Sequence, residues 1–457
     1  MKNSWDYRIR RLMLPGLKRW ILIVLCGIAA IVLGVFLLLG YHPITVTGLF
    51  IRELMEHAAD VLPHRISGIL VITVGGLIVC LAIARITMSV LGAYLPDDRE
   101  SIPDVLYRRR HLDRGPRVVV IGGGTGLSNL LRGLKNFTNN ITAVVTVGDD
   151  GGSSGRLREE LGVLPPGDIR NCITALADED KLVTELFRYR FESGKGLEGH
   201  SFGNLFLTAL WEITNGDMLE AARVAGRVLN SCGQVVPSTL TGITLVADMA
   251  DGRVVRGESQ IPYADGKIVR LHCEPTVCRA VPEAIEAILN AELIVLGPGS
   301  LYTSIIPNLL IQGIPDAIRQ SSARRIYVCN VMTQLGETVN YTVGDHLGAL
   351  LTHAGIPAGA GYKLIEAVLV NNQLLEAPAG VTVAPVRFDP ERLRELGVRA
   401  IRRPLLGREL AGHHDSTRLA RALMFWFFRQ RRRRGTPGQA KKGQPRSAAL
   451  LNQLPSP

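Results

Sequence analysis

Two short polar segments carry the residues in this sequence whose types and spacing suggest chemistry. The first is a glycine run made up of Gly122, Gly123, Gly124, Thr125 and Gly126. It follows the apolar run 117–121 and precedes a helical pattern at 127–137. Missing side chains let a ligand approach the backbone, and the free N–H groups at the start of a helix attract anions. The glycine run therefore predicts a phosphate-binding turn.

The spacing of the glycine run separates it from two common nucleotide-binding loops. No Gly-Lys-Ser or Gly-Lys-Thr follows it, so it is not a Walker loop. Counted from Gly122, the last position of the GxGxxG pattern is Leu127, so the dinucleotide fingerprint is not satisfied either. A tight strand-to-helix turn without a ligand stays open as the alternative.

The second segment is an acidic pair, Asp149 and Asp150, which follows the next strand pattern at 142–147. Ligands of open α/β sheets bind beyond the carboxyl ends of the strands. There the pair could accept a ribose hydroxyl, or hold Mg²⁺ against the phosphates of a ligand. Ser153 and Ser154 follow it and are candidates to contact a further phosphate. A solvated Asp-Gly turn is the alternative interpretation.

Three further loops of similar composition follow other elements. The first, 165–171, contains Asp168, a candidate helix cap, and Arg170, a candidate phosphate clamp. Candidate ligand-binding residues in the other two are Asn204 in loop 199–205, and Gly297, Gly299 and Ser300 in loop 297–304. Segment 330–334 ends another strand pattern. Loops at the carboxyl ends of parallel strands share one rim, so we expect one anion-accepting cleft.

The elements that must position these loops form an alternating pattern from residue 116 onward. Short apolar runs are expected as strands at 117–121, 142–147, 242–247, 293–296, 325–330 and 367–370. Helical patterns separate them at 127–137, 218–229, 282–290 and 345–354, and a last one covers 416–428. Apolar strands alternating with helices predict an α/β fold, a doubly wound, mostly parallel Rossmann-like sheet. Residues 254–255 and 268–271 are expected to form an antiparallel excursion.

Two apolar segments precede this body, at 21–40 and 66–84, and neither contains a charged residue. About 20 such residues suffice for a helix to cross the hydrocarbon of a bilayer. Lys and Arg gather before the first segment and after the second, which places both termini and the main domain in the cytoplasm. We therefore expect a membrane anchor at 1–91, a basic linker at 92–115, an α/β domain at 116–428 and a basic disordered tail at 429–457.

The net charge of +11 comes from the two ends of the chain, and the rest is close to neutral. Basic ends of this kind predict contact with an anionic membrane surface. Nucleic acid is disfavoured as a partner because no aromatic residues interleave with the charges of the tail. The seven cysteines are expected to be reduced, and Cys273 and Cys278 are expected to be core thiols rather than metal ligands.

The polar loops together resemble those of the YvcK/CofD-like family, often called gluconeogenesis factors. The matching stretches are IGGGTGLSNLLRGL, VTVGDDGGSSGRLREE, LPPGDIRNC, GHSFGNL, GPGSLYTS and NVMTQ, which begin at 121, 145, 164, 199, 297 and 330. The Gly-Gly-Ser-Ser-Gly segment after the acidic pair is similar to the YvcK branch. The resemblance spans about residues 116–422, so it does not include the anchor or the tail.

This resemblance implies a CofD-like fold and a UDP-sugar ligand such as UDP-GlcNAc, whose phosphates would face Gly122 to Gly126. It also implies a regulatory role in cell shape and envelope synthesis during gluconeogenic growth, with envelope-synthesis proteins as partners. The CofD branch implies an alternative, a Mg²⁺-dependent 2-phospho-L-lactate transferase with its metal at Asp149 and Asp150. A homo-oligomer, the identity of the nucleotide sugar and any catalysis stay open.

Overall fold

The computed structural model describes residues 17–39, 64–94, 111–177, 181–357, 359–374, 383–407 and 412–434. The chain divides into two compact units, residues 1–109 and 110–457. Each unit is described by itself. Most of the predicted linker at 92–115 lies outside the described residues.

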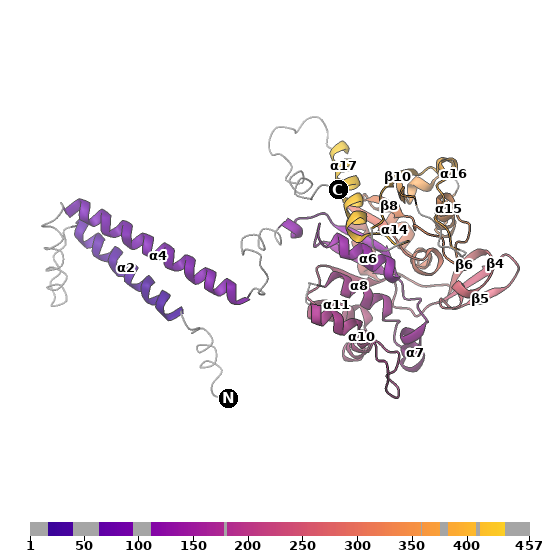
Figure 1. Cartoon of the computed structure of the whole chain (residues 1–457), viewed down its shortest axis with the longest axis horizontal. Coiled ribbons are helices and arrows are strands. Elements are labelled where there is room, and N and C mark those ends of the chain that lie inside the picture. The colour runs from indigo at the N-terminus through magenta and orange to yellow at the C-terminus, as the bar shows by residue number, and fades with distance from the viewer. Residues whose placement is uncertain are drawn as a thin grey trace. The chain divides into compact units, whose positions relative to one another are not determined.

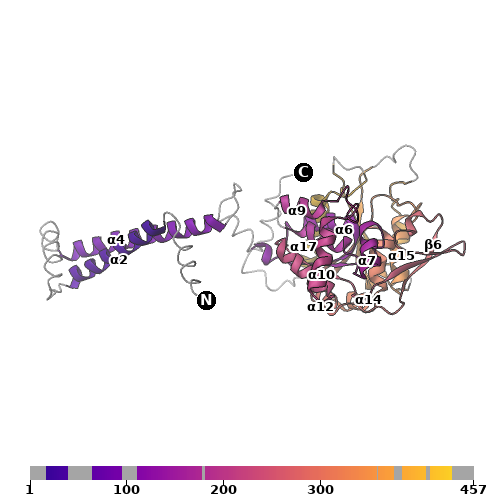
Figure 2. The same cartoon turned by 90° about the horizontal axis from the view of Figure 1, so that it is seen from below.

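The N-terminal unit is a pair of helices, α2 (Leu17–Leu39) and α4 (His64–Tyr94), which lie side by side in both views (Figures 1 and 2). Glycines allow the two backbones to approach closely. A Cβ added to Gly27 would lie 3.2 Å from the carbonyl oxygen of Gly75, and one added to Gly34 would lie 3.1 Å from that of Gly68. Small residues at such crossings are typical of helices that pack within lipid.

The apolar side chains of this unit point mostly outward, among them Leu25, Leu77 and Leu81, each about 60% exposed. Helix α4 contains a segment long and apolar enough to cross a membrane, Gly68–Ile86. The apolar stretch described in α2, Ile23–Val35, is shorter, although the helix itself has 23 residues. Within the described residues one helix is both long and apolar enough to span, where the sequence predicted two.

The second unit is built on a seven-stranded sheet in the order β10-β9-β8-β7-β1-β2-β3, in which every neighbouring pair is parallel. Its strands are β1 (Val118–Gly122), β2 (Ile141–Val145), β3 (Gln234–Pro237), β7 (Leu293–Leu296), β8 (Arg324–Val328), β9 (Ala367–Asn371) and β10 (Arg399–Arg403). Strands β1 and β7 are completely buried, as strands covered on both faces must be. The predicted mostly parallel α/β sheet is confirmed.

Two groups of helices pack among themselves and cover the sheet (Figures 1 and 2). The first group lies in the chain between β1 and β3 and is joined by the last helix: α6 (Gly124–Leu134), α7 (Gly152–Leu161), α8 (Gly167–Leu176), α9 (Lys181–Arg188), α10 (Phe202–Ile213), α11 (Met218–Val228) and α17 (Ser416–Arg434). The second group is α12 (Pro282–Asn290), α13 (Ile306–Leu310), α14 (Ile314–Gln320), α15 (Val343–His353) and α16 (Pro390–Glu395).

The direction of the chain through the sheet reverses between β1 and β7. From β1 it proceeds to β2 and β3 on one side, and from β7 to β8, β9 and β10 on the other. Such a reversal leaves a crevice at the carboxyl ends of the two central strands, where open α/β sheets bind ligands. The glycine run follows β1 and the 297–304 loop follows β7, so both lie at this crevice.

A smaller antiparallel sheet has the order β5-β4-β6, with β4 (Thr244–Met249), β5 (Val254–Arg256) and β6 (Ile268–Glu274). It confirms the predicted antiparallel excursion but also takes in the strand predicted at 242–247, which had been assigned to the main sheet. Strands β3 and β10 were not predicted. Helix α17 continues to Arg434, past the predicted start of the disordered tail at 429.

Candidate functional site

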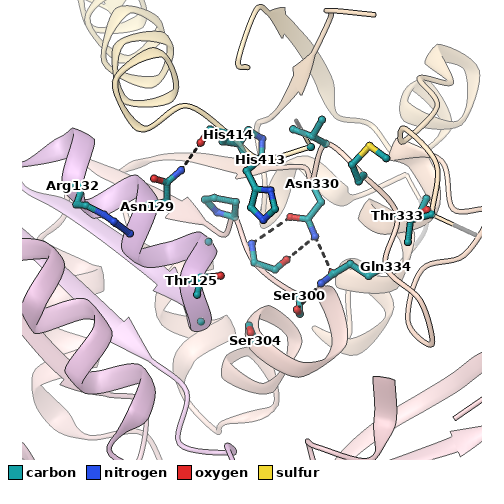
Figure 3. A pocket seen from close by; sticks show the side chains of 18 residues that line it. Thr125, Asn129, Arg132, Ser300, Ser304, Asn330, Thr333, Gln334, His413 and His414 are labelled. Atoms are coloured by element: carbon teal, nitrogen blue, oxygen red, sulfur yellow. Dashed lines mark hydrogen bonds between the residues drawn. The ribbon is translucent and has the colours of Figure 1, made fainter. Parts of the chain in front are cut away.

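A pocket of about 560 Å³ opens at the crevice between β1 and β7, and we call it the glycine pocket (Figure 3). Segments from five parts of the chain line it: Gly124, Thr125, Gly126, Asn129 and Arg132; Pro298, Gly299, Ser300 and Ser304; Asn330 to Gln334; Val383; and Gly412, His413 and His414. Five of the predicted ligand-binding residues lie here, namely Gly124, Thr125, Gly126, Gly299 and Ser300.

Close backbone contacts give the glycine pocket its shape. Gly124 has a φ of +66°, which favours glycine. A Cβ on Gly126 would lie 2.9 Å from the carbonyl oxygen of Pro298 and 3.0 Å from the backbone of Gly299. The turn after β1 and the loop after β7 can therefore approach each other only because Gly126 has no side chain.

Amide side chains hold the opposite wall, as Figure 3 shows. Asn330 Nδ2 donates to the carbonyl oxygen of Gly299 at 2.8 Å, and Asn330 Oδ1 accepts from the Gly299 N–H at 3.3 Å. Gln334 Nε2 donates to Ser300 Oγ at 2.8 Å, and Gln334 Oε1 accepts from Asn330 at 3.1 Å. The loop after β8 thus fixes the loop after β7.

Among the described residues, no carboxylate lines the glycine pocket. Helix α6 begins there; its N-cap, Gly123, has no side chain, and the Gly124 N–H is already taken by the Asp168 carboxylate from behind the pocket. Arg132 adds a positive charge, and burial lowers the pKa of His414 to about 4, so that ring is neutral at pH 7. The amides left free in the first turn of α6 and a guanidinium suit an anionic ligand.

Gly122, Gly123 and Gly297 lie buried behind the pocket rather than on its wall. A Cβ on Gly123 would lie 2.5 Å from Asp168 Oδ2, and a Cβ on Gly297 would lie 2.8 Å from Ile305. These glycines allow close packing beneath the pocket.

A second pocket, of about 820 Å³, lies along helix α7, and we call it the arginine pocket. It is lined by Asp150, Gly152, Ser153, Gly155, Arg156, Arg158, Glu159, Arg190 and Gly199. No described residue lines both pockets. The sequence had placed the glycine run and the acidic pair in one cleft. In the structure Asp150 lines the arginine pocket, whereas Asp149 lines neither pocket and interacts with Asp168, which accepts from the Gly124 N–H of the glycine run.

The two aspartates of the acidic pair make different contacts. Asp149 Oδ1 accepts from the N–H of Gly151 at 3.0 Å, within its own turn. Both oxygens of Asp150 accept backbone N–H groups of the loop after β5, from Glu258 at 3.1 Å and Ser259 at 2.8 Å. Asp150 therefore ties the small antiparallel sheet to the end of β2.

Acidic side chains gather beneath these contacts. Burial and the Asp149 carboxylate raise the pKa of Asp168 to about 6 and that of Glu258 to about 8. Asp168 is not the cap of α8, as the sequence had suggested: Pro166 holds that position, and Asp168 accepts instead from the Gly124 N–H. Burial is the larger cause of the raised pKa values, and repulsion among these carboxylates adds to it.

The described residues contain no group of three or more His, Cys, Asp or Glu side chains arranged to hold a metal ion. The carboxylates of Asp149, Asp168 and Glu258 interact electrostatically, but they do not form a ready ligand set. Cys273 and Cys278 are buried, as predicted for core thiols.

The remaining predicted residues form a buried polar network behind the arginine pocket. Asn204 Nδ2 donates to Ser153 Oγ at 3.1 Å, which lies 2.9 Å from His200 Nδ1. Arg170 donates to Ser201 Oγ and to Asn171 Oδ1, and burial together with Arg190 lowers its pKa. Ser154 is buried against Gly167.

The predicted set did not include several residues that line the glycine pocket. Thr125, Asn129 and Arg132 recur at helical spacing along α6, so one face of that helix could have been extended from Thr125. Asn330 and Gln334 were recognised as part of a polar loop but not as site residues. Nothing in the local pattern marked His413 and His414, because they reach the pocket from a distant part of the chain.

Comparison with known proteins agrees with this geometry. The family model described as 2-phospho-L-lactate transferase CofD matches residues 118–406. A protein of Nostoc sp. is 50% identical over 423 residues, which is 90% of this chain and 91% of its own length. That share exceeds what residues 110–457 provide, so the similarity reaches into the N-terminal unit.

Shorter relatives match the second unit. The "Gluconeogenesis factor" of Bacillus subtilis is 48% identical over 294 residues, 63% of this chain and 90% of its own. A crystal structure of a Bacillus halodurans protein superposes with a TM-score of 0.65 at 45% identity, over 68% of this chain and 100% of that one. The chain belongs to the CofD/YvcK family, among the gluconeogenesis factors.

Proposed function

We propose that this protein is a membrane-anchored regulatory protein that binds a UDP-sugar in the glycine pocket. The observation that carries the proposal is a pocket at the reversal point of the sheet, lined by the first turn of α6 and Arg132 and by no described carboxylate, with Asp168 behind it on the Gly124 N–H. A diphosphate matches that charge pattern. Ser300, Asn330 and Gln334 supply hydroxyl and amide groups for the sugar or the base.

The regulatory part of the proposal follows from what the glycine pocket lacks. Its described lining contains no carboxylate that could serve as a general base, and burial lowers the pKa of His414 to about 4, which makes that ring a weak base. The named relatives are called gluconeogenesis factors rather than enzymes. A role in cell shape and envelope synthesis under gluconeogenic growth, through envelope-synthesis proteins, fits a ligand sensor of this kind.

The anchor is proposed to be a hairpin of two spans, with both termini and the second unit in the cytoplasm. Outward-facing leucines on α2 and α4 and their glycine crossings support it, because such a surface is costly in water. Extraction of membranes with carbonate tests the proposed anchor. The full-length chain should resist removal from membranes by carbonate, and a chain that begins at residue 110 should be released.

Binding is tested by titrating full-length protein in detergent micelles with UDP-GlcNAc, followed by calorimetry and thermal unfolding. Ligand at 100 times its dissociation constant should stabilise the protein by about 2.7 kcal/mol. UDP alone should bind more weakly, and GDP-linked sugars should bind more weakly still. Absence of both heat and thermal shift would overturn the proposal.

A Mg²⁺-dependent 2-phospho-L-lactate transferase is the second candidate, favoured by one observation. The raised pKa values of Asp168 and Glu258 report crowded carboxylates, which a divalent cation would relieve. Asp149 is the predicted metal residue that faces this group, whereas both oxygens of Asp150 are already taken by backbone amides. Mg²⁺ bound there would offset the charge of the donor's diphosphate while an acceptor hydroxyl takes the phospholactyl group and the nucleoside monophosphate leaves. Turnover of a nucleotide-diphospho-lactate donor that requires Mg²⁺ and is lost in Asp149→Asn would establish this alternative.

A further inference from the structure

The arginine pocket has a charge pattern that the proposed ligand of the glycine pocket does not explain. Arg156 and Arg158 project from α7, and Arg190 comes from the segment after α9. Each of the three guanidinium groups donates a hydrogen bond to an uncharged oxygen atom. Arg156 donates to the carbonyl oxygen of Glu198 at 2.8 Å, Arg158 donates to Thr244 Oγ1 at 3.1 Å, and Arg190 donates to the carbonyl oxygen of Gly199.

None of these three guanidinium groups forms an ion pair with a carboxylate that the structure describes. Arginines elsewhere on the second unit do form such pairs: Arg223 and Arg227 with Glu220, Arg253 with Asp251, Arg256 with Glu274, and Arg324 with Glu366. The arginine pocket therefore keeps its positive charge uncompensated.

Neighbouring groups respond to this charge. Burial and Arg156 lower the pKa of His200, and Arg190 contributes to the same effect. The Ser153 hydroxyl accepts from Asn204 and can therefore give its own proton to Nδ1 of a neutral His200. The wall of the pocket at Ser153 is thus held in place without adding negative charge.

Two acidic residues also line the arginine pocket, and they do not cancel the arginines. Both Asp150 oxygens already accept backbone N–H groups from Glu258 and Ser259. Glu159 lines the pocket and is exposed, so water screens its charge. Helix α7 also begins at this pocket, and no side chain caps its first turn at Gly151. Apart from the Glu159 carboxylate, the groups left available to a ligand are donors.

We propose that the arginine pocket is a second binding site, for a phosphate monoester dianion, separate from the nucleotide-sugar site. Planar guanidinium groups recognise phosphate by paired hydrogen bonds, and the start of α7 adds backbone N–H groups. The proposal does not depend on which ligand occupies the glycine pocket, because the two pockets share no described lining residue.

The test is calorimetric titration of full-length protein in detergent micelles with inorganic phosphate at pH 8, where phosphate is mostly dianionic. Wild-type protein should show saturable binding at one site. Arg156→Gln combined with Arg190→Gln should weaken that binding at least tenfold. Glycerol 3-phosphate in a parallel titration distinguishes the sources: tighter binding than phosphate identifies an organic monoester, and equal binding identifies free phosphate.

The matched control is Arg227→Gln, an exposed arginine that is paired with Glu220 away from the pocket. It should leave phosphate affinity within twofold of wild type. Arg156→Lys keeps the charge but loses the planar guanidinium group, so this variant should bind phosphate with intermediate affinity. It keeps the proposal testable if the double variant does not fold. UDP-GlcNAc affinity, measured on the same samples, should stay within twofold throughout.

The proposal is overturned if wild-type protein shows no saturable phosphate binding up to tens of millimolar. It is also overturned if the folded double variant binds phosphate as tightly as wild type does. Wild-type protein that binds phosphate but does not bind UDP-GlcNAc would count against the nucleotide-sugar proposal alone.

Discussion

The glycine pocket and the arginine pocket both follow central strands of one parallel sheet, yet they are built from different chemistry. The glycine pocket follows β1 and β7 and uses backbone amides, amide side chains and one guanidinium. The arginine pocket follows β2 and uses several guanidinium groups beside carboxylates. In the arginine pocket, Asp150 also accepts from the Glu258 and Ser259 N–H groups, which ties the end of β2 to the small sheet. Adjacent strand ends therefore need not serve the same cavity.

The largest expected effect comes from closing the glycine pocket. Gly126→Val would place carbon atoms against Pro298 and Gly299, where even a Cβ lies within 3.0 Å of backbone. We expect UDP-GlcNAc binding to fall more than a hundredfold, and stability to fall by about 1–3 kcal/mol from overpacking. Phosphate binding at the arginine pocket should persist in the folded fraction, as calorimetry would measure.

Gly348→Ala is the matched control for that variant. Gly348 lies inside α15, and an added Cβ would meet nothing within 4 Å. The change should leave ligand binding intact and stabilise the protein by about 0.5–1 kcal/mol. Equal loss of UDP-GlcNAc binding in both variants would show that the close backbone contact at Gly126 is not the cause of the lost affinity.

The next effect concerns the carboxylates that lie beneath the acidic pair. The pKa of Glu258 is about 8 in the folded chain and near 4.5 when unfolded. Between these values the folded state binds more protons, so the free energy of unfolding falls as pH rises through this window. Glu258→Gln should therefore stabilise the protein by about 1–3 kcal/mol at pH 8 and by little at pH 4, once solvent screening is allowed for.

Chemical denaturation at several pH values measures this difference. Glu286→Gln, a change of an exposed glutamate on α12, provides the comparison and should show no such pH dependence. A stabilisation by Glu258→Gln that is the same at both pH values would mean that Glu258 does not titrate in this window.

The smallest expected effect comes from a change of Asp150, and it tests whether this residue has a structural role or binds the ligand. Asp150→Asn removes a charge-assisted contact to the Glu258 and Ser259 amides and should cost about 1 kcal/mol of stability. Hydrogen exchange at those two amides should become faster, while UDP-GlcNAc affinity stays unchanged. A large loss of nucleotide-sugar affinity would instead place Asp150 in the ligand site.

Much of the fold could be read from the sequence, and the exceptions have physical causes. Strand β7 was predicted with its observed bounds because a buried apolar run has clear ends. Strand β3 is short and ends in proline, and β10 is an edge strand with the sequence RAIRR, so neither shows an apolar pattern. Strand β4 was assigned to the wrong sheet because its local pattern does not specify its partners.

The parts of the candidate site that are formed by glycine-rich backbone could be predicted from the sequence. The parts that are contributed by segments distant in the sequence could not. The glycine run and the Gly-Pro-Gly loop are recognisable from their composition, and both line the glycine pocket. His413 and His414 reach it only through the path of the chain after β10. Asp150 accepts from backbone N–H groups of a loop more than 100 residues away, a contact that no local pattern encodes.

The central claim, that nucleotide-sugar binding belongs to the glycine pocket alone, is tested most directly by two variants in one titration. UDP-GlcNAc dissociation constants are measured for Arg132→Gln and for the combined Arg156→Gln and Arg190→Gln chain. We expect a loss of about tenfold or more for the first, since a charge-assisted hydrogen bond contributes about 1.5–3 kcal/mol, and less than twofold for the second. Equal losses in both variants would contradict the claim and show that one ligand spans both pockets.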